Sequence, residues 1–212
     1  MLSSPGIGSK RPKKPSSSTP RGQRTRNAIL SAAATEVAED GYRGASLASI
    51  AAAVNLTQQG VLHHFPSKDQ LLLALLEEKY HDDGRRLESS LEQEGLGMLR
   101  ALQALVERNE TQAELVRLFS VVVAESLSAR HPAHQYFLTR YAKIRARMLR
   151  SLREGQSAGA VRDDVDVDRL VPVIVAVMDG LQIQWLLDPE GVDMVASFKV
   201  FARVVTRCLT PD

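Results

Sequence analysis

A short polar run in the first third of the chain, Thr57–Gly60, has the residue types that read a nucleic acid. Gln58 and Gln59 could each form two hydrogen bonds with the edge of an adenine in the major groove of DNA. The glycine that follows would let the backbone approach the DNA closely. A helix that starts here would also attract phosphate through its unpaired N–H groups and its dipole. His63 and His64 complete the polar side chains expected to point outward.

The other reactive side chains form no recognisable catalytic or metal site. His63 and His64 are adjacent, so their side chains diverge on a helix, and neither they nor His131 and His134 have a carboxylate or cysteine at ligand spacing. The segment Asp164–Asp168 lacks the glycine and the final glutamate of a calcium loop, and it fits the N-cap and first turn of a helix better. We therefore expect no catalytic residue, no metal and no cofactor.

Two short helices are predicted to position the polar run, over residues 46–54 and 57–64. A turn of three or four residues joins them, which is the spacing of a helix-turn-helix. Ser46 is a good N-cap, Ala51 is small enough for the two helices to cross closely, and Asn55 can adopt the positive φ that a sharp turn needs. An ordinary corner between two helices would look similar, so the spacing alone leaves both structures open.

The rest of the chain has helical periodicity, and no segment alternates apolar and polar residues between turn signals, which predicts an all-α fold. Gly41 is expected to end the first helix, and Ser67–Gln70 and Thr111–Glu114 are predicted capping boxes. Pro172 is expected to start or to bend the eighth helix. The further helices are predicted over residues 25–40, 68–82, 97–109, 112–128, 132–154, 167–187 and 190–208.

The charge distribution divides the chain into a basic beginning and an acidic remainder. Residues 1–68 contain nine Lys/Arg and three Asp/Glu, whereas the other residues contain eighteen Lys/Arg and twenty-two Asp/Glu. A basic end suggests that this part meets a polyanion, although a basic tail on a neutral protein would give the same charges. We predict a disordered basic tail over residues 1–23, a DNA-binding head over 24–68 and a body over 69–212. The tail could be a solubilising leader or could add a weak contact with DNA.

Composition also bounds the cellular setting. No apolar run approaches the roughly 20 residues needed to span a bilayer, and the first residues lack the hydrophobic stretch of a signal peptide. Cys208 is the single cysteine, so a disulfide within one chain is impossible, and we expect this side chain to pack in the last helix. These features predict a cytoplasmic protein that has no contact with a membrane.

In residues 24–76 the sequence resembles the TetR family of transcriptional regulators. The resemblance rests on residue types in the family's register: Gly41-Tyr42, Ser46-Leu47, Ile50-Ala51, Leu56-Thr57, Val61, His64-Phe65, Ser67-Lys68 and Leu71-Leu72. It favours the helix-turn-helix over a purely structural corner. It also implies an all-α body, in which the last two helices form a dimer interface and the middle helices commonly enclose a small effector.

The resemblance assigns roles to individual residues of the head. Ser46 would cap the second helix and touch a phosphate, and residues 58–60 would face the bases. His63, His64 and Lys68 would lie at the phosphate backbone. The predicted DNA-binding residues are Ser46, Thr57, Gln58, Gln59, Gly60, His63, His64 and Lys68. The sequence departs from the common family pattern at Leu62, at His63 and in the order Gln59-Gly60. The operator sequence therefore does not follow from the resemblance.

For the body, the resemblance places an effector pocket among the fifth to eighth helices. Few charges are expected on the faces concerned, which predicts a largely apolar effector. Each candidate could equally be an ordinary core residue. The candidates are Phe119, Val122, Ser126, Tyr141, Met178, Gln182 and Trp185.

The function predicted from the sequence is a homodimeric DNA-binding transcriptional regulator. It would repress transcription from a palindromic double-stranded operator and be released by a small, mostly apolar effector. Gly180 in the eighth helix would serve close packing, either between subunits or within one. Two alternatives remain at this point: a DNA-binding regulator without a small-molecule ligand, and an all-α carrier or enzyme whose basic head is incidental.

Overall fold

The structure is a computed structural model that describes residues 19–91 and 96–211; of residues 81–91 it describes only the helical backbone. Every regular element in these ranges is an α-helix, which confirms the all-α prediction. Most of the predicted tail, residues 1–18, lies outside the described residues. Its last part was predicted wrongly, because Pro20–Gln23 form the start of the first helix.

The first helix, α1 (Pro20–Gly44), is longer than predicted at its N-terminal end. The side chain of Thr19 accepts a hydrogen bond from the Gly22 N–H at 3.3 Å, and Pro20 occupies the first turn, where its missing N–H is not needed. The helical path breaks at Gly41, where φ is +72°. Gly41 thus interrupts the helix with a positive φ, as the sequence suggested.

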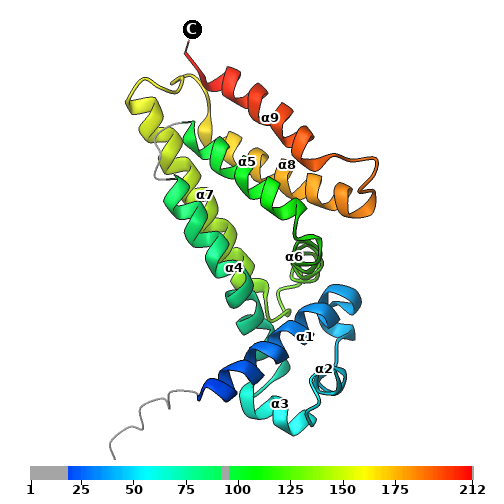
Figure 1. Cartoon of the computed structure of the whole chain (residues 1–212). Coiled ribbons are helices and arrows are strands. Elements are labelled where there is room, and N and C mark those ends of the chain that lie inside the picture. The colour runs from blue at the N-terminus through cyan, green and yellow to red at the C-terminus, as the bar shows by residue number, and fades with distance from the viewer. Residues whose placement is uncertain (1–18, 92–95, 212) are drawn as a thin grey trace, which may run out of the picture.

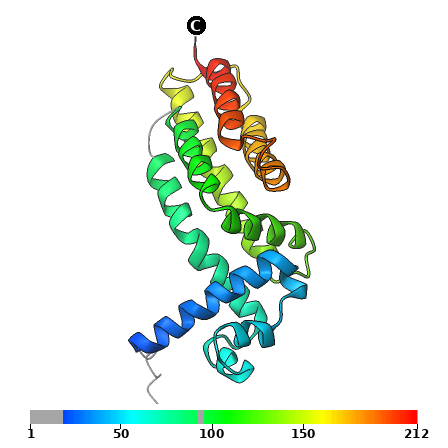
Figure 2. The same ribbon diagram turned by 45° about the vertical axis from the view of Figure 1, so that its right-hand side comes forward.

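Helices α2 (Leu47–Ala53) and α3 (Gln58–His64) form the predicted helix-turn-helix. Asn55, in the turn between them, has a φ of +55°, which confirms its expected conformation. Ala51 is buried where the two helices meet. Figures 1 and 2 show α2 and α3 together at one end of the molecule, below α1.

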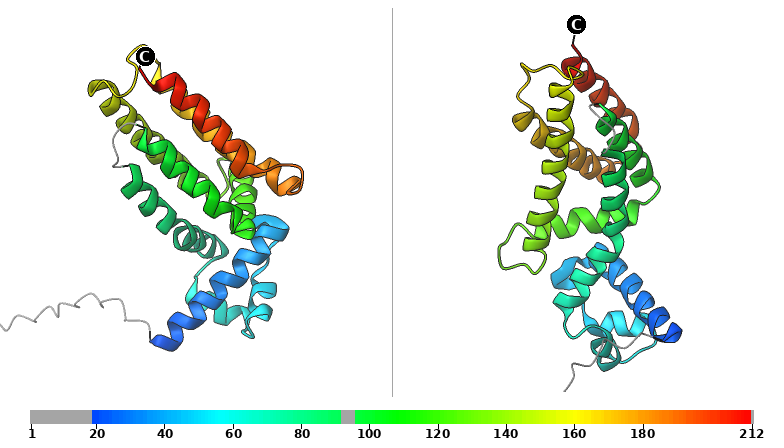
Figure 3. Two further views of the ribbon diagram at one scale, coloured as in Figure 1. Left: turned by 45° about the horizontal axis from the view of Figure 1, so that its top comes forward. Right: turned by 90° about the vertical axis from the view of Figure 1, so that its left-hand side faces the viewer.

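The longer helices of the body extend away from this end (Figure 1). Helix α4 continues nine residues beyond its predicted end at residue 82, and α8 agrees with its predicted bounds. The body helices are α4 (Lys68–Leu91), α5 (Gly97–Glu110), α6 (Ala113–Glu125), α7 (His134–Ser157), α8 (Val167–Leu187) and α9 (Met194–Leu209). Helices α8 and α9 lie at the end farthest from α2 and α3 (Figure 3).

The predicted helix signals had mixed outcomes. Ser67 accepts from the Gln70 N–H at 3.1 Å, and Asp166 caps α8 by accepting from the Arg169 N–H at 3.1 Å, both as expected. The capping box at Thr111 was wrong, because the Thr111 hydroxyl instead donates to the Arg108 carbonyl at 2.8 Å and closes α5. Pro172 lies inside α8 rather than at its start.

Helix α8 is the one helix in the described ranges that is long and apolar enough to cross a membrane by length and composition alone, with a mean hydropathy of 1.7. The expectation that no segment reaches this length was therefore wrong. Asp179 lies within the helix, and the residues of one face, such as Val171 and Ile174, are buried against α7 and α9. This packing explains the apolar residues on that face of α8.

The described residues form two apolar cores. One joins α5, α7, α8 and α9 with Val116 of α6, and its most buried members include Met148 and Phe198. The other begins in the head and continues into α4, α6 and α7 through Leu118 and Val122. Cys208 belongs to neither core: it is exposed on α9, so its expected packing role was wrong.

Candidate nucleic-acid interface

The polar run lies at the start of α3, the second helix of the helix-turn-helix. Gln58, Gln59 and His63 are exposed on α3, and His64 is half-buried against His63, with ring centroids 5.7 Å apart. Gly60 is half-buried, and a Cβ added there would meet only the side chains of Thr57 and Leu56, at 3.5 Å or more. The fold therefore does not require glycine at position 60, which leaves close approach of a ligand as a reason for it.

Ser46 and Thr57 use their side chains to begin the two helices. The Ser46 hydroxyl oxygen accepts from the Ser49 N–H at 3.0 Å, and the Thr57 hydroxyl oxygen accepts from the Gly60 N–H at 3.1 Å. Such caps satisfy N–H groups that have no partner inside the helix. Both residues are exposed at or beside the N-terminus of a helix, where an anion is favoured.

Lys68 lies beside this surface at the start of α4 and is held in place by the head. Its ammonium group is 4.5 Å from the centroid of the Tyr42 ring, and it donates to the Arg43 carbonyl at 3.4 Å. The Tyr42 hydroxyl donates to Asp69, and burial is the main reason why the pKa of Tyr42 lies well above its usual range. Lys68 thus has a packing role in addition to any contact with phosphate.

A single carboxylate joins the head to α6. Glu125 accepts a hydrogen bond from the Tyr42 backbone N–H at 2.7 Å, just after the break at Gly41. A Cβ on Gly41 would lie 2.8 Å from Glu125 Oε1, and the positive φ of Gly41 disfavours any other residue. The glycine therefore allows the head and α6 to approach this closely.

His131 lies on the other side of this junction. Its ring packs edge-on against Tyr42, with centroids 5.0 Å apart, and its Nε2 is 4.0 Å from Glu125 Oε2. Burial lowers the pKa of His131 although the Glu125 charge opposes this effect. The neutral imidazole is therefore favoured, and its Nδ1 accepts from the Ala133 N–H at 3.2 Å.

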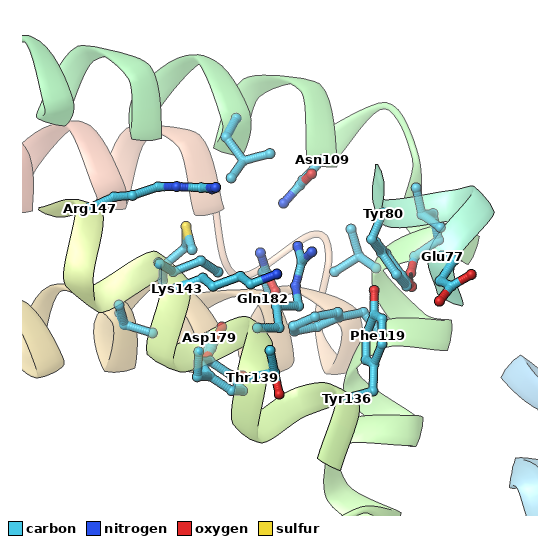
Figure 4. A pocket seen from close by; sticks show the side chains of 18 of the residues that line it. Glu77, Tyr80, Asn109, Phe119, Tyr136, Thr139, Lys143, Arg147, Asp179 and Gln182 are labelled. Atoms are coloured by element: carbon cyan, nitrogen blue, oxygen red, sulfur yellow. Dashed lines mark hydrogen bonds between the residues drawn. The ribbon is translucent and has the colours of Figure 1, made fainter. Parts of the chain in front are cut away.

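A cavity of about 810 Å³ opens in the body between α4, α5, α6, α7 and α8 (Figure 4). Of the predicted pocket residues, Phe119, Tyr141, Met178 and Gln182 line it.

The other three predicted pocket residues, Val122, Ser126 and Trp185, do not line the cavity. Val122 is fully buried in the core that continues from the head, and Trp185 is buried in the other core. The Ser126 hydroxyl is used within its own turn, where it donates to the Val123 carbonyl at 2.8 Å.

The cavity wall carries more charge than the sequence led us to expect. Glu77 lines it from α4, Asp179 from α8, and three basic residues line it from α7: Arg140, Lys143 and Arg147. The Tyr141 hydroxyl donates to Asp179 at 2.8 Å, and burial raises the pKa of Asp179. The regular spacing of the three cations was visible in the sequence, but which face of the helix meets the cavity was not. No group of three or more potential metal ligands occurs among the described residues.

Family models match both parts of the chain. Residues 29–75 match the model of bacterial regulatory proteins of the tetR family. Residues 97–210 match the model of the C-terminal domain of BetI-type transcriptional repressors.

Curated relatives span most of the chain. The HTH-type transcriptional repressor AcnR of Corynebacterium jeikeium is 28% identical over 159 residues, which are 72% of this chain and 77% of the relative. An HTH-type transcriptional repressor of Mycobacterium tuberculosis is 30% identical over 157 residues, 74% of this chain and 79% of the relative. The HTH-type transcriptional regulator TtgR of Pseudomonas putida is 28% identical over 183 residues, 82% of this chain and 85% of the relative.

Solved structures share the fold. A TetR transcriptional regulator from Chloroflexus aurantiacus superposes with a TM-score of 0.76 at 22% identity, covering 92% of this chain and all of that one. A complex of SmeT, a repressor from Stenotrophomonas maltophilia, with triclosan superposes with a TM-score of 0.72 at 22% identity, covering 90% of this chain and 93% of that one.

The junction between head and body yields the first prediction. We expect Glu125→Ala to lower the free energy of unfolding by about 1–3 kcal/mol, because the Tyr42 N–H loses its partner in a half-buried place. Glu125→Gln keeps an acceptor oxygen and should cost less. Urea denaturation measures both, with Glu114→Ala, an exposed change on the same helix, as the control. Equal stability of the wild type and Glu125→Ala would show that this hydrogen bond contributes nothing.

Proposed function

The chain belongs to the TetR family of bacterial transcriptional regulators, and we propose that it acts in the cytoplasm as a homodimeric repressor that a small, mostly apolar effector releases from a palindromic operator. The observation that carries the proposal is the position of the cavity. Its walls include α4 and α6, the two body helices that α1 packs against. A molecule in the cavity would therefore contact the helices that support the DNA-binding head.

The DNA-binding part of the proposal assigns base contacts to Gln58, Gln59 and the backbone at Gly60. The residues that would lie along the phosphate backbone are Ser46, Thr57, His63, His64 and Lys68. Two features support this assignment: the exposure of the glutamines on a capped helix, and the absence of any packing in the chain that requires glycine at position 60. In a dimer, two such helices would enter successive major grooves, roughly 34–36 Å apart.

The dimer part of the proposal assigns the interface to α8 and α9. Large apolar side chains are half or more exposed on these two helices: Val173, Ile183, Leu187, Val200 and Val204. A Cβ added to Gly180 would meet no atom within 4 Å, so packing inside one subunit does not need this glycine. Close approach of a second subunit would give both the exposed apolar side chains and the glycine a purpose.

The effector part of the proposal assigns the cavity to a small molecule. Its volume of about 810 Å³ lies within the usual range for ligand sites, and Phe119, Ile144 and Met178 give it apolar surface. SmeT, which shares this fold, has been solved in complex with a small molecule, triclosan. An effector would act by binding the released conformation more tightly than the DNA-bound one.

The second prediction tests the DNA-binding face with a selected operator. We expect Gln59→Ala to lose about 1–3 kcal/mol of discrimination at particular base pairs. Lys68→Ala should weaken binding to all sequences and reduce the slope of log affinity against log salt by about one. Lys79→Ala, on the same helix but away from α3, is the control for Lys68. Unchanged sequence preference and salt dependence in both variants would refute this assignment.

The third prediction concerns the dimer. We expect Gly180→Leu to shift the protein toward monomer, because a leucine there would hold the two subunits apart. The space around Gly180 within one subunit is open, so the monomer should remain folded by circular dichroism. Sedimentation at micromolar concentration measures the assembly, and Ala52→Leu in the head is the control. A wild-type monomer, or a Gly180→Leu dimer as tight as the wild type, contradicts the interface.

The fourth prediction concerns the effector. Operator affinity should fall about 5–150-fold for the active members of a library of apolar compounds. Ile144→Trp, which fills part of the cavity, should abolish this response and leave operator binding without compound unchanged. Leu138→Trp, an exposed position on the same helix, should respond like the wild type. If no compound changes the affinity, the effector part of the proposal fails and the DNA-binding part stands.

A further inference from the structure

One wall of the cavity is strongly basic. Arg140, Lys143 and Arg147 follow one another on α7 at intervals of three and four residues, which places them on one face of the helix. Figure 4 shows Lys143 and Arg147 extending from α7 into the cavity. A surface of this kind attracts a negatively charged group.

Arg140 is the cation whose surroundings point most directly to a ligand. Its guanidinium lies over the rings of Tyr80 and Phe119, 5.3 Å and 5.6 Å from their centroids. No carboxylate of the described chain forms an ion pair with it within 4.0 Å, and its Nε is buried without a hydrogen-bond partner. A buried N–H donor of this kind costs free energy unless something accepts its hydrogen bond.

The acidic residues of the cavity do not satisfy Arg140. Asp179 accepts a hydrogen bond from Tyr141 at 2.8 Å and forms no ion pair with Arg140 within 4.0 Å; burial raises the pKa of its carboxyl group, and the Tyr141 hydrogen bond and the Arg140 charge oppose this effect. Glu77 is exposed on α4. The polar groups of the cavity therefore favour an anionic over a cationic ligand.

We propose that the effector is an amphipathic anion whose carboxylate pairs with Arg140 and whose apolar part lies against Phe119, Ile144 and Met178. The inference rests on the proposed effector site and adds the chemical class of the ligand. A guanidinium presents parallel N–H groups that match the two oxygens of a carboxylate, and the free Nε of Arg140 is one such donor. A carboxylate is preferred to a phosphate because a doubly charged group costs more to remove from water.

Three compounds with one apolar body and different head groups test the inference: phenylbutyrate, phenylbutanol and phenylbutylamine. Calorimetric titration of the full-length protein should give an affinity for the acid about ten- to a hundredfold higher than for the alcohol. Arg140→Met keeps the length of the side chain and should reduce the affinity for the acid to that of the alcohol. Arg150→Met, an exposed change on the same helix, should leave all three affinities unchanged.

Arg140→Lys keeps the charge without the paired donors and should retain part of the preference for the acid, which provides a second variant if Arg140→Met does not fold. Equal affinity for acid and alcohol, preference for the amine, or binding of none of the three would overturn the inference. So would a preference for the acid that survives in Arg140→Met. The proposed function is decided separately, because release of the operator by a neutral compound would leave it standing while the anionic class fails.

Discussion

The hydrogen bond from the Tyr42 backbone N–H to the Glu125 carboxylate, 2.7 Å long, forms where α1 leaves its helical path at Gly41. The break frees this N–H, and the absence of a side chain at Gly41 lets the carboxylate reach it. The core of the head continues across this contact into Leu118 and Val122 of α6. Because the head and α6 share a buried core and a hydrogen bond, we expect a displacement of α6 to move the head. The DNA-binding surface therefore depends on the position of a body helix.

Helix α8 connects the cavity with the proposed dimer interface. Met178 and Gln182 line the cavity from one side of the helix, whereas Ile183 and Leu187 are exposed. Gly180 lies between Met178 and Gln182 in the sequence and has open space around it. A ligand in the cavity would thus touch α6, which is fixed to the head, and α8, which would be fixed to the second subunit. In the proposed dimer, both contacts would affect the distance between the two DNA-binding heads, which is the quantity that an operator reads.

The sequence predicted the parts of this structure that local rules govern. Asp166 as an N-cap and the 3.6-residue periodicity predicted the bounds of α8, and Ser46 and Asn55 predicted the N-cap of α2 and the turn that follows it. Local rules failed where a side chain had a second possible hydrogen-bond partner. Thr111 closes α5 instead of opening α6, because its hydroxyl finds a carbonyl of the preceding turn. The polar composition of residues 20–23 suggested a tail, although Thr19 and Pro20 contained the signal for a helix start.

The cavity was harder to predict because its walls come from five helices. Phe119 lines it and Val122 does not, although both lie on α6, and only tertiary packing separates them. Arg140 stacks on Tyr80 of α4 and Phe119 of α6, so a carboxylate that pairs with Arg140 would act on the two helices nearest to the head. A ligand releases DNA only through its difference in affinity between the two conformations. The coupling is reciprocal, so an operator held by the head would weaken ligand binding by the same factor by which the ligand weakens binding of the operator.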